Sequence, residues 1–400
     1  METKVQIKEL FSTLNFSDKL SIYEELGVLL ETENGAIFFS EDFGEGENIS
    51  STEISNEYVN EKKDKPLREK VLDFFPAKPV LENCIECNST KIIRWGTYHN
   101  EQRYKCKNCN RTFTANTSNI AHDIHKLEEF LDFGDCMFNG EFHSIDYLSK
   151  KFKVDTKTAF DWRHKYLSSV STTEEAITFR GTVEMDDVWV ELNEKGRKDK
   201  TDSRKRGGGT AGDNDKKVKV LFSVERAGES SLKVVRSGRL RKDDISRALR
   251  NDCFAPQAEL CSDMHPSIVA FGKAKELKHK TFKASEHVKD KVIHVQTINS
   301  MASHLKKTIN NKMRGVATKY LQNYANWFRI EQKFKDMPNK FRHIIENYMQ
   351  NNKAWDHFSN AEAIYKRFIE KYSRLEYTEP EAKKRKSCEW NFQNIEELLI

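Results

Sequence analysis

Four cysteines form two short pairs, CIEC at Cys84–Cys87 and CKNC at Cys106–Cys109, with 18 residues between the pairs. Two residues between thiols allow one tight turn to present both sulfurs to a tetrahedral ion, and two such turns complete a four-cysteine zinc site. Because thiolates would fill all four positions, none stays open for water, and the expected Zn²⁺ is structural. The other cysteines have no partner at this spacing and are expected to be small core side chains or bystanders: Cys136, Cys253, Cys261 and Cys388.

The segment between the two pairs interleaves aromatic and basic side chains, which are Arg94, Trp95, Tyr98, Arg103, Tyr104 and Lys105. A ribbon of this composition can contact nucleic acid, but the same side chains could simply cover a small core. The sequence leaves both interpretations open.

Two aspartates are candidates for a second metal site, with oxygen ligands. Asp186 lies in the middle of an apolar segment, TVEMDDVWV, and a carboxylate on a central strand is costly unless it is paired or bound to a cation. Asp263 ends another short strand segment. If the two strands are neighbours, these carboxylates meet at one end of the sheet and could share a divalent metal. Glu184, on the same strand face as Asp186, and Asp187, on the opposite face, are competing acids.

A third candidate ligand lies in the segment HVQTINSMASHLKK. Asn299 follows Asp263 by 36 residues, and Lys306 lies seven residues, or two helical turns, further on. Both side chains therefore project from one face of a helix, about 10 Å apart along its axis. One could reach a metal, as a weaker ligand for Mg²⁺ than a carboxylate, and the other a DNA phosphate.

A strongly basic stretch, KGRKDKTDSRKR at positions 195–206, lies between two expected strands. It has seven basic residues in twelve and includes the run Arg204, Lys205 and Arg206. A solvated flexible loop is one interpretation. Beside a site that handles DNA, phosphate contact is the better one.

The segment that follows the second cysteine pair is typical of helices joined by short turns. Apolar spacing predicts one helix over 125–138, and Ser144 and Asp155 can cap two more that run to Phe152 and Tyr166. The break of a few residues between the last two helices is what a helix-turn-helix requires.

The basic residues of the third helix are candidates for DNA contact, and these are Lys157, Arg163 and Lys165. A recognition helix needs an apolar face against its scaffold and a basic face toward the groove, and Ala159, Phe160 and Trp162 could form the first. An ordinary surface helix with solvated charges is the alternative.

Strand and helix signals alternate from Thr182 onward. The patterns predict strands over 182–190, 218–224, 232–235, 258–262 and 278–282, and helices over 242–250, 267–275 and from about 297. Three strands, helix, strand, helix, strand and helix is the element order of an RNase H-like fold, in which the first and fourth strands lie side by side in a mixed sheet. From about 320 to 375 the chain is helical and rich in aromatic residues.

Composition and charge exclude several classes of protein. The 400 residues include 25 Phe, 12 Tyr and 6 Trp, which excludes a wholly disordered chain, and no apolar run approaches the roughly 18 residues that span a bilayer. The N-terminus lacks the features of a signal peptide, so we expect a cytoplasmic protein in a reducing compartment. Residues 1–75 carry 8 basic and 17 acidic residues although the whole chain has a net charge of +5, and the basic remainder suggests a polyanion as partner.

These signals together predict a multidomain α+β protein. Its expected parts are an acidic leader with a helix and a linker (1–75), a zinc ribbon (78–120), a helix-turn-helix region (121–172), an RNase H-like mixed α/β domain (178–345) and a helical C-terminal region with a basic tail (346–400).

The run from Cys84 to Ser303 resembles the insertion-sequence transposases that have an N-terminal zinc ribbon and an ISXO-type catalytic domain. The matching motifs are CxxC…RYKCKNC…TF, TAFDWRHK, VEMDD, the strand ending in Asp263, and HVQTINS…LKK followed by GVATKYLQNYANWF. The leader and the tail after about 345 fall outside this resemblance.

The resemblance implies a DDE-type transposase of RNase H-like fold that cuts and joins DNA with two Mg²⁺ or Mn²⁺ ions. Its three metal ligands fall on Asp186, Asp263 and Asn299, and its associated basic residue on Lys306. Most transposases of this class have Glu at the third position, whereas a branch of the family has Asn, and Asp187 stands where relatives commonly have Glu. The implied reaction is in-line phosphoryl transfer without a covalent protein intermediate.

The expected partners are double-stranded DNA, as element ends and target, and further copies of the chain on that DNA, in a nucleoid-associated prokaryotic protein without membrane contact. One alternative is a transposase-derived DNA-binding protein without catalysis. A metal-dependent nuclease that acts on other nucleic acid is a further alternative, which the expected ribbon and helix-turn-helix disfavour.

Overall fold

A computed structural model of the chain describes residues 81–98, 101–115, 117, 120–173, 176–196, 212, 214–226, 228–250, 252–283, 288–289, 293–349 and 353–377. All of these residues belong to one unit of the chain, Leu67–Ile400. The predicted leader 1–75, the basic residues Arg204, Lys205 and Arg206, and the end of the tail lie outside the described residues. In the part that is described, no helix is both long and apolar enough to cross a membrane.

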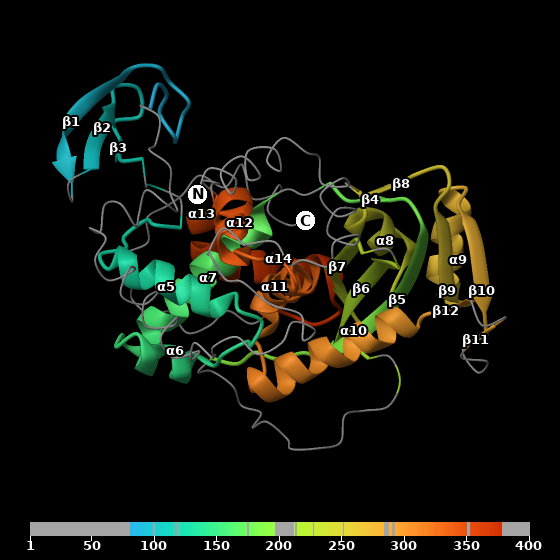
Figure 1. The fold of residues 1–400 in the computed structure, drawn as a ribbon. Helices are drawn as coiled ribbons and strands as arrows, with labels where there is room; N and C mark the ends of the chain where they lie inside the picture. The colour runs from blue at the N-terminus through green and yellow to red at the C-terminus, as the bar shows by residue number, and fades with distance from the viewer. Residues whose placement is uncertain are drawn as a thin grey trace, which may run out of the picture. The chain divides into compact units, whose positions relative to one another are not determined.

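The structure is a mixed α/β fold around a five-stranded sheet with strand order β10-β9-β5-β6-β7 (Figure 1). The strands are β5 (Thr182–Glu191), β6 (Lys217–Glu225), β7 (Ser230–Ser237), β9 (Glu259–Asp263) and β10 (Lys278–Phe282). The first three are antiparallel neighbours, whereas β9 runs parallel to β5 and β10 runs parallel to β9. The predicted contact between the first and fourth strands is therefore confirmed.

Both faces of this sheet are covered by helices, because its strands alternate two sets of apolar side chains. Met185, Leu221 and Val235 pack with α8 (Lys242–Ala248) and α9 (Pro266–Ala274) on one face. Val188, Phe222 and Leu232 lie on the other face, in a core that also includes Ile298 and Leu305 of α10 (Gln296–Lys307). Helix α10 therefore packs on this second face of the sheet.

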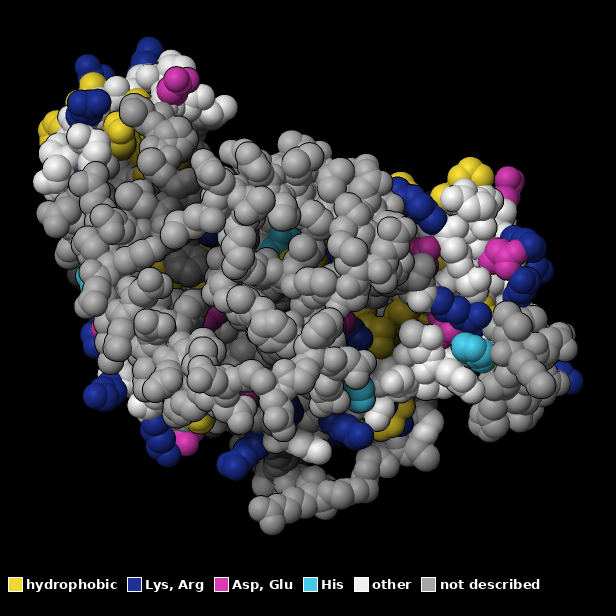
Figure 2. All heavy atoms as spheres, viewed as in Figure 1, with side chains coloured by type: hydrophobic (Ala, Val, Ile, Leu, Met, Phe, Trp, Pro, Cys, Tyr) yellow, Lys and Arg dark blue, Asp and Glu magenta, His cyan; other side chains and the backbone are white. Residues whose placement is uncertain are grey.

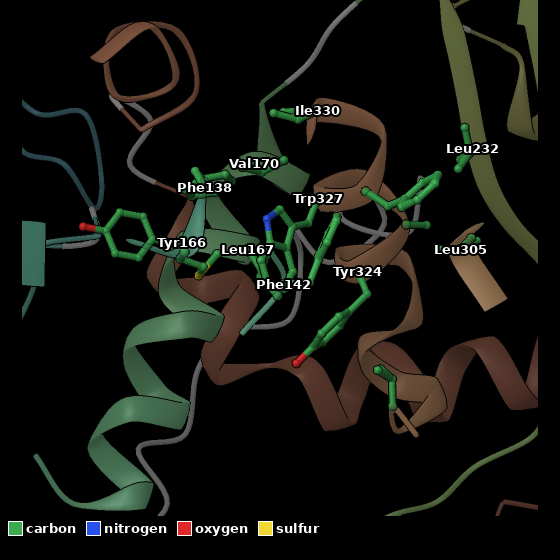
Figure 3. Close-up of a cluster of buried hydrophobic side chains, with 14 of the residues drawn as sticks. Phe138, Phe142, Tyr166, Leu167, Val170, Leu232, Leu305, Tyr324, Trp327 and Ile330 are labelled. Carbon is green, nitrogen blue, oxygen red and sulfur yellow. The ribbon is translucent and has the colours of Figure 1, made fainter. Parts of the chain in front are cut away.

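The helices before and after the sheet share that second core. They are α5 (Leu127–Met137), α6 (Ile145–Lys151), α7 (Thr156–Thr172), α11 (Leu321–Lys333), α12 (Lys340–Tyr348), α13 (Ala354–Ser359) and α14 (Ala361–Tyr372). Figure 3 shows Trp327 of α11 among Phe138, Phe142 and Tyr324, with ring centroids 4.9–6.2 Å from its own. One apolar core therefore runs from α5 and α7 to the sheet.

A small three-stranded sheet precedes the helices, with β1 (Ile92–Tyr98), β2 (Glu101–Cys106) and β3 (Thr112–Phe113) in sequence order. Its own small core contains Cys84, Cys106, Tyr104 and Phe113. The chain also has two further pairs of very short strands, β4 (Thr178–Phe179) with β8 (Cys253–Phe254) and β11 (Val288–Lys289) with β12 (Ile293–His294).

Candidate functional site

Asp186 and Asp263 lie level with each other on two neighbouring parallel strands. The β5–β9 pairing ends at Glu184 and Cys261, and Asp186 and Asp263 each lie two residues beyond it, close enough for the charge of Asp263 to act on Asp186. Side chains that are level on adjacent strands point to the same face. The sequence placed these two acids together, and the strand pairing brings them together.

The electrostatics of this pair favour a bound cation. Burial, together with the nearby carboxylates of Asp263 and Asp187, raises the pKa of Asp186 to about 7, although the backbone N–H of Asp187 donates to its Oδ1 at 2.8 Å. Two carboxylates that share a half-buried position repel each other unless a proton or a metal lies between them. Asp263 in turn accepts a hydrogen bond from the backbone N–H of His265 at 3.0 Å, which fixes its orientation.

Glu184, one of the competing acids, caps the N-terminus of α10. It is fully buried, and its carboxylate accepts hydrogen bonds from Thr297 N (3.0 Å), Thr297 Oγ1 (3.0 Å) and Ile298 N (3.3 Å) in the first turn of α10. Arg226 Nε donates to it at 2.8 Å. The residue before this helix is Val295, which has no side-chain acceptor, so Glu184 of β5 caps the helix in its place and ties α10 to the strand that carries Asp186.

Asp187, the other competing acid, points to the opposite face of β5. Its carboxylate pairs with Lys219 Nζ of β6 at 2.5 Å and lies 3.9 Å from His265 Nε2. Glu184 and Asp187 both have basic partners, whereas Asp186 and Asp263 have no ion pair within the described residues.

Asn299 and Lys306 lie on one stripe of α10, beside the line of buried residues that faces the sheet. The helix starts at the carboxylate of Glu184, and further along Lys306 Nζ lies 4.4 Å from the ring centroid of Trp189. This stripe therefore runs along β5 between Glu184 and Trp189, the stretch that contains Asp186. Asn299 is exposed, and Lys306 is partly buried.

The four predicted zinc ligands converge. The Sγ atoms of Cys84, Cys87, Cys106 and Cys109 all lie within 4.8 Å of one another, with 3.7 Å between Cys84 and Cys109 and 3.6 Å between Cys87 and Cys106. A tetrahedral Zn²⁺ with bonds of about 2.3 Å separates its sulfurs by about 3.8 Å, so the cluster can hold this ion with shifts of no more than about 1 Å.

Both cysteine turns have the same backbone design. Cys84 N donates to Ser89 O and Cys106 N donates to Arg111 O, each at 2.9 Å. The residue after each pair is an asparagine in the left-handed region, Asn88 (φ 54°) and Asn110 (φ 58°), a conformation that asparagine tolerates better than most residues. Backbone N–H groups of residues 109 and 108 donate to Cys106 and lower the pKa of its thiol to about 6, whereas burial and the neighbouring thiols raise the pKa of Cys109 to about 12, so without a metal the cluster favours one thiolate beside protonated thiols.

The basic residues of α7 do not lie together on a free face. Arg163 is buried, donates to His143 O and lies 5.4 Å over the ring of Trp327, and Lys165 is buried against His122 O and the ring of Trp355. The expectation that these two side chains face a DNA groove is therefore wrong for this conformation, because α11 and α13 cover that side of the helix. Lys157, in the first turn of α7, remains exposed and pairs with Asp161.

Known protein families and relatives match the part of the chain that contains the candidate metal ligands. Residues 178–330 match the family model of the ISXO2-like transposase domain, a range that includes Asp186, Asp263, Asn299 and Lys306. The chain is also 26% identical over 270 residues to an uncharacterized protein in transposable element ISH50 of Halobacterium salinarum, over 64% of this chain and 87% of that relative.

Residues 178–330 therefore match an ISXO2-like transposase domain, and the resemblance to insertion-sequence transposases is confirmed. A domain of this family indicates a nuclease-type enzyme that cuts DNA and uses divalent metal. Sequence reasoning missed the capping role of Glu184, although a helix start at Val295 without a side-chain acceptor was a usable signal. It also missed Trp189, Lys217 and Lys219, which carry no motif.

Proposed function

We propose that this protein is a DNA transposase that binds the ends of its mobile element and catalyses metal-dependent strand cleavage and strand transfer. The observation that carries the proposal is the level position of Asp186 and Asp263 on the parallel strands β5 and β9, with the raised pKa of Asp186. The strand order supports an RNase H-like catalytic domain, since its first and fourth strands are neighbours.

The carboxylates of Asp186 and Asp263 and the amide oxygen of Asn299 would hold Mg²⁺ or Mn²⁺. Two such ions supply Lewis acidity to the scissile phosphate and a nucleophile at neutral pH, as in other two-metal sites. The chain's own part is positioning: β5 and β9 fix the two acids, and Glu184 fixes the start of the helix that carries Asn299. Lys306 would hold a DNA phosphate two turns further along that helix.

Element-end binding is assigned to the N-terminal part of the described chain. The four cysteines would hold one structural Zn²⁺ in a zinc ribbon, whose strand β1 exposes Trp95 and Tyr98. The helices α6 and α7 would act as a helix-turn-helix through the exposed first turn of α7, where Lys157 lies. The run Arg204, Lys205 and Arg206 would add phosphate contacts that are independent of sequence. Assembly of several copies on DNA stays a prediction.

The test is Mg²⁺-dependent cleavage and joining of a labelled duplex that carries the element's own ends. The parent protein should cut and join, whereas Asp186→Ala and Asp263→Ala should lose the reaction by at least a hundredfold and still bind the ends. Asn299→Ala should also cripple the reaction, and Asn299→Asp should retain part of it because an oxygen stays at similar reach. Cleavage by Asp263→Ala at the parent rate would contradict the proposed pair. A parent that binds its ends in Mg²⁺ but never cuts them would favour the non-catalytic DNA-binding alternative.

A further inference from the structure

Three lysines gather around one exposed tryptophan beside the carboxylate pair. Lys217 Nζ and Lys306 Nζ lie 4.5 and 4.4 Å from the ring centroid of Trp189, and Lys219 is the residue opposite Trp189 in the β5–β6 register. Trp189 is 39% exposed, whereas Lys217 and Lys219 are 7% and 5% exposed. The side chains of Lys217 and Lys219 are therefore held in place by their neighbours and are not mobile in solvent.

The lysines are close enough to repel one another. Burial lowers the pKa of Lys306, and the charges of Lys219 and Lys217 lower it further. Within the described part of the chain, Lys219 has an ion pair with Asp187, while Lys217 donates to a neutral acceptor, Gly212 O at 2.7 Å. Glu191 lies opposite Lys217 in the β5–β6 register, so three lysines face two acids, and positive charge is in excess at a place where side chains are already ordered, which is the condition for binding an anion.

Lysines at the opposite edge of the same sheet are arranged differently. Lys278 and Lys280 of β10 both donate to the carboxylate of Glu259 and hold its pKa at about 2. Figure 2 shows acidic and basic side chains side by side over the β9–β10 edge. Lysine clusters on this sheet are therefore not all alike, because Lys278 and Lys280 both pair with Glu259, whereas neither Lys217 nor Lys306 has an ion pair within the described residues.

The position of the cluster relates it to the carboxylate pair. The charge of Lys219 acts on Asp186, and Lys219 pairs with Asp187, the next residue of β5. Trp189 lies three residues beyond Asp186, about 10 Å along an extended strand and on the opposite face of β5, and Lys306 of α10 reaches its ring from the helix that lies over the face of Asp186. A DNA strand whose scissile phosphate lies at Asp186 and Asp263 would bring a neighbouring phosphate within reach of long lysine side chains.

We propose that Lys217, Lys219 and Lys306, held around Trp189, form a binding site for a backbone phosphate that neighbours the scissile phosphate. Trp189 is a positioning residue in this site, since its ring fixes the ammonium groups of Lys217 and Lys306 by cation–π contact. The inference rests on the proposed function, because it takes a DNA strand at the carboxylate pair as its ligand.

The first experiment measures the salt dependence of binding to the element-end duplex in EDTA, where no strand is cut. Lys217→Met keeps the aliphatic stem on Trp189 and removes the charge, so the slope of log affinity against log salt should fall by about 0.9. Lys306→Met should do the same. The matched control is Lys278→Met, a lysine of the same sheet that Glu259 already neutralises, and its slope should equal that of the parent. Unchanged slopes in both test variants, or an equal fall in the control, would overturn the site.

A second arm separates this inference from the proposed function. Inorganic pyrophosphate should raise the thermal unfolding temperature of the parent and of Lys278→Met, and should raise that of Lys217→Met by less than half as much. If the parent failed to bind or cut its ends but kept this lysine-dependent stabilisation, the proposed function would fail and the anion site would stand. If the parent cut normally while both lysine variants matched it in slope and in pyrophosphate response, the site would be overturned and the function would stand.

Discussion

The thiol cluster and the carboxylate pair are both proposed metal sites, but the chain builds them in opposite ways. All four sulfurs come from two turns within Cys84–Cys109, and each turn repeats the same backbone hydrogen bond. The acids Asp186 and Asp263 come from strands 77 residues apart in the sequence numbering, and Asn299 comes from a helix that a third acid, Glu184, ties down. The first site depends on local geometry, whereas the second depends on the fold of the whole domain.

The largest effect is expected at the thiol cluster, because a structural zinc site of this kind contributes about 10 kcal/mol or more to local folding. The parent should contain one zinc per chain, and Cys84→Ser should lose it together with most of its affinity for element ends. Metal analysis by mass spectrometry measures this, with Cys253→Ser, an exposed cysteine outside the cluster, as the control that keeps its zinc. Less than half an equivalent of zinc in the purified parent would contradict the assignment of a structural zinc site to the four cysteines.

Strand cleavage at the carboxylate site should instead depend on Glu184, a residue that is not a proposed metal ligand. Glu184→Ala leaves two backbone N–H groups and Arg226 without their buried acceptor, so the free energy of unfolding should fall by about 3 kcal/mol. Strand cleavage should fall with it, because the start of α10 is no longer fixed to β5. Chemical denaturation and the cleavage assay measure the two effects, and Glu191→Gln, an exposed acid of the same strand, is the control. Parent-like stability in Glu184→Ala would show that α10 is held in another way.

The same division explains how much could be predicted from the sequence. Period-two alternation located β5, β6 and β10 to within a residue or so, and Ser144 and Asp155 cap α6 and α7 as expected, since caps depend on neighbours in the chain. The strand pairs β4–β8 and β11–β12 were not predicted, because two residues are too short for any periodicity.

What could not be predicted depends on contacts between distant segments. Helix α7 runs six residues beyond the expected end at Tyr166, and its second half is buried by α11 and α13, so Arg163 and Lys165 became core residues. Likewise, the lysines around Trp189 come from two elements, β6 and α10, and have no common motif. The spacing of charges along a helix does not reveal which face a later helix will cover.

The burial of α7 makes a prediction about pH. His164 is buried against the rings of Phe160 and Tyr320, and burial together with the charges of Arg163 and Lys319 lowers its pKa well below the usual value. Below about pH 6.5 the imidazole of His164 is protonated in the unfolded chain but stays neutral in the folded chain. The free energy of unfolding should therefore fall as the pH is lowered, by up to about 1.4 kcal/mol per pH unit. Denaturant unfolding at pH 7.5 and pH 5.5 measures this. His164→Phe should make the dependence shallower without removing it, because burial also lowers the pKa of His357 to about 4, and an equally steep fall in that variant would assign the dependence to other groups.

The smallest effect concerns two lysines of α7 that look alike in the sequence. Lys157 is exposed in the first turn, so Lys157→Gln should lower the salt slope of end binding by about 0.9. Lys165 is buried against Trp355, so Lys165→Met should leave that slope unchanged. Fluorescence anisotropy at several salt concentrations distinguishes the two. A reversed order would mean that α7 moves out of its core position when DNA binds.

We propose that Asp186 and Asp263 hold the catalytic metal, and anomalous diffraction from crystals of the protein bound to its element ends with Mn²⁺ tests this most directly. An anomalous peak is expected about 2.1 Å from a carboxylate oxygen of each aspartate, on the face of the sheet that α10 covers, and it should be lost in Asp263→Ala. Mn²⁺ bound instead at Glu184 or Asp187, or an unchanged peak in Asp263→Ala crystals, would contradict it.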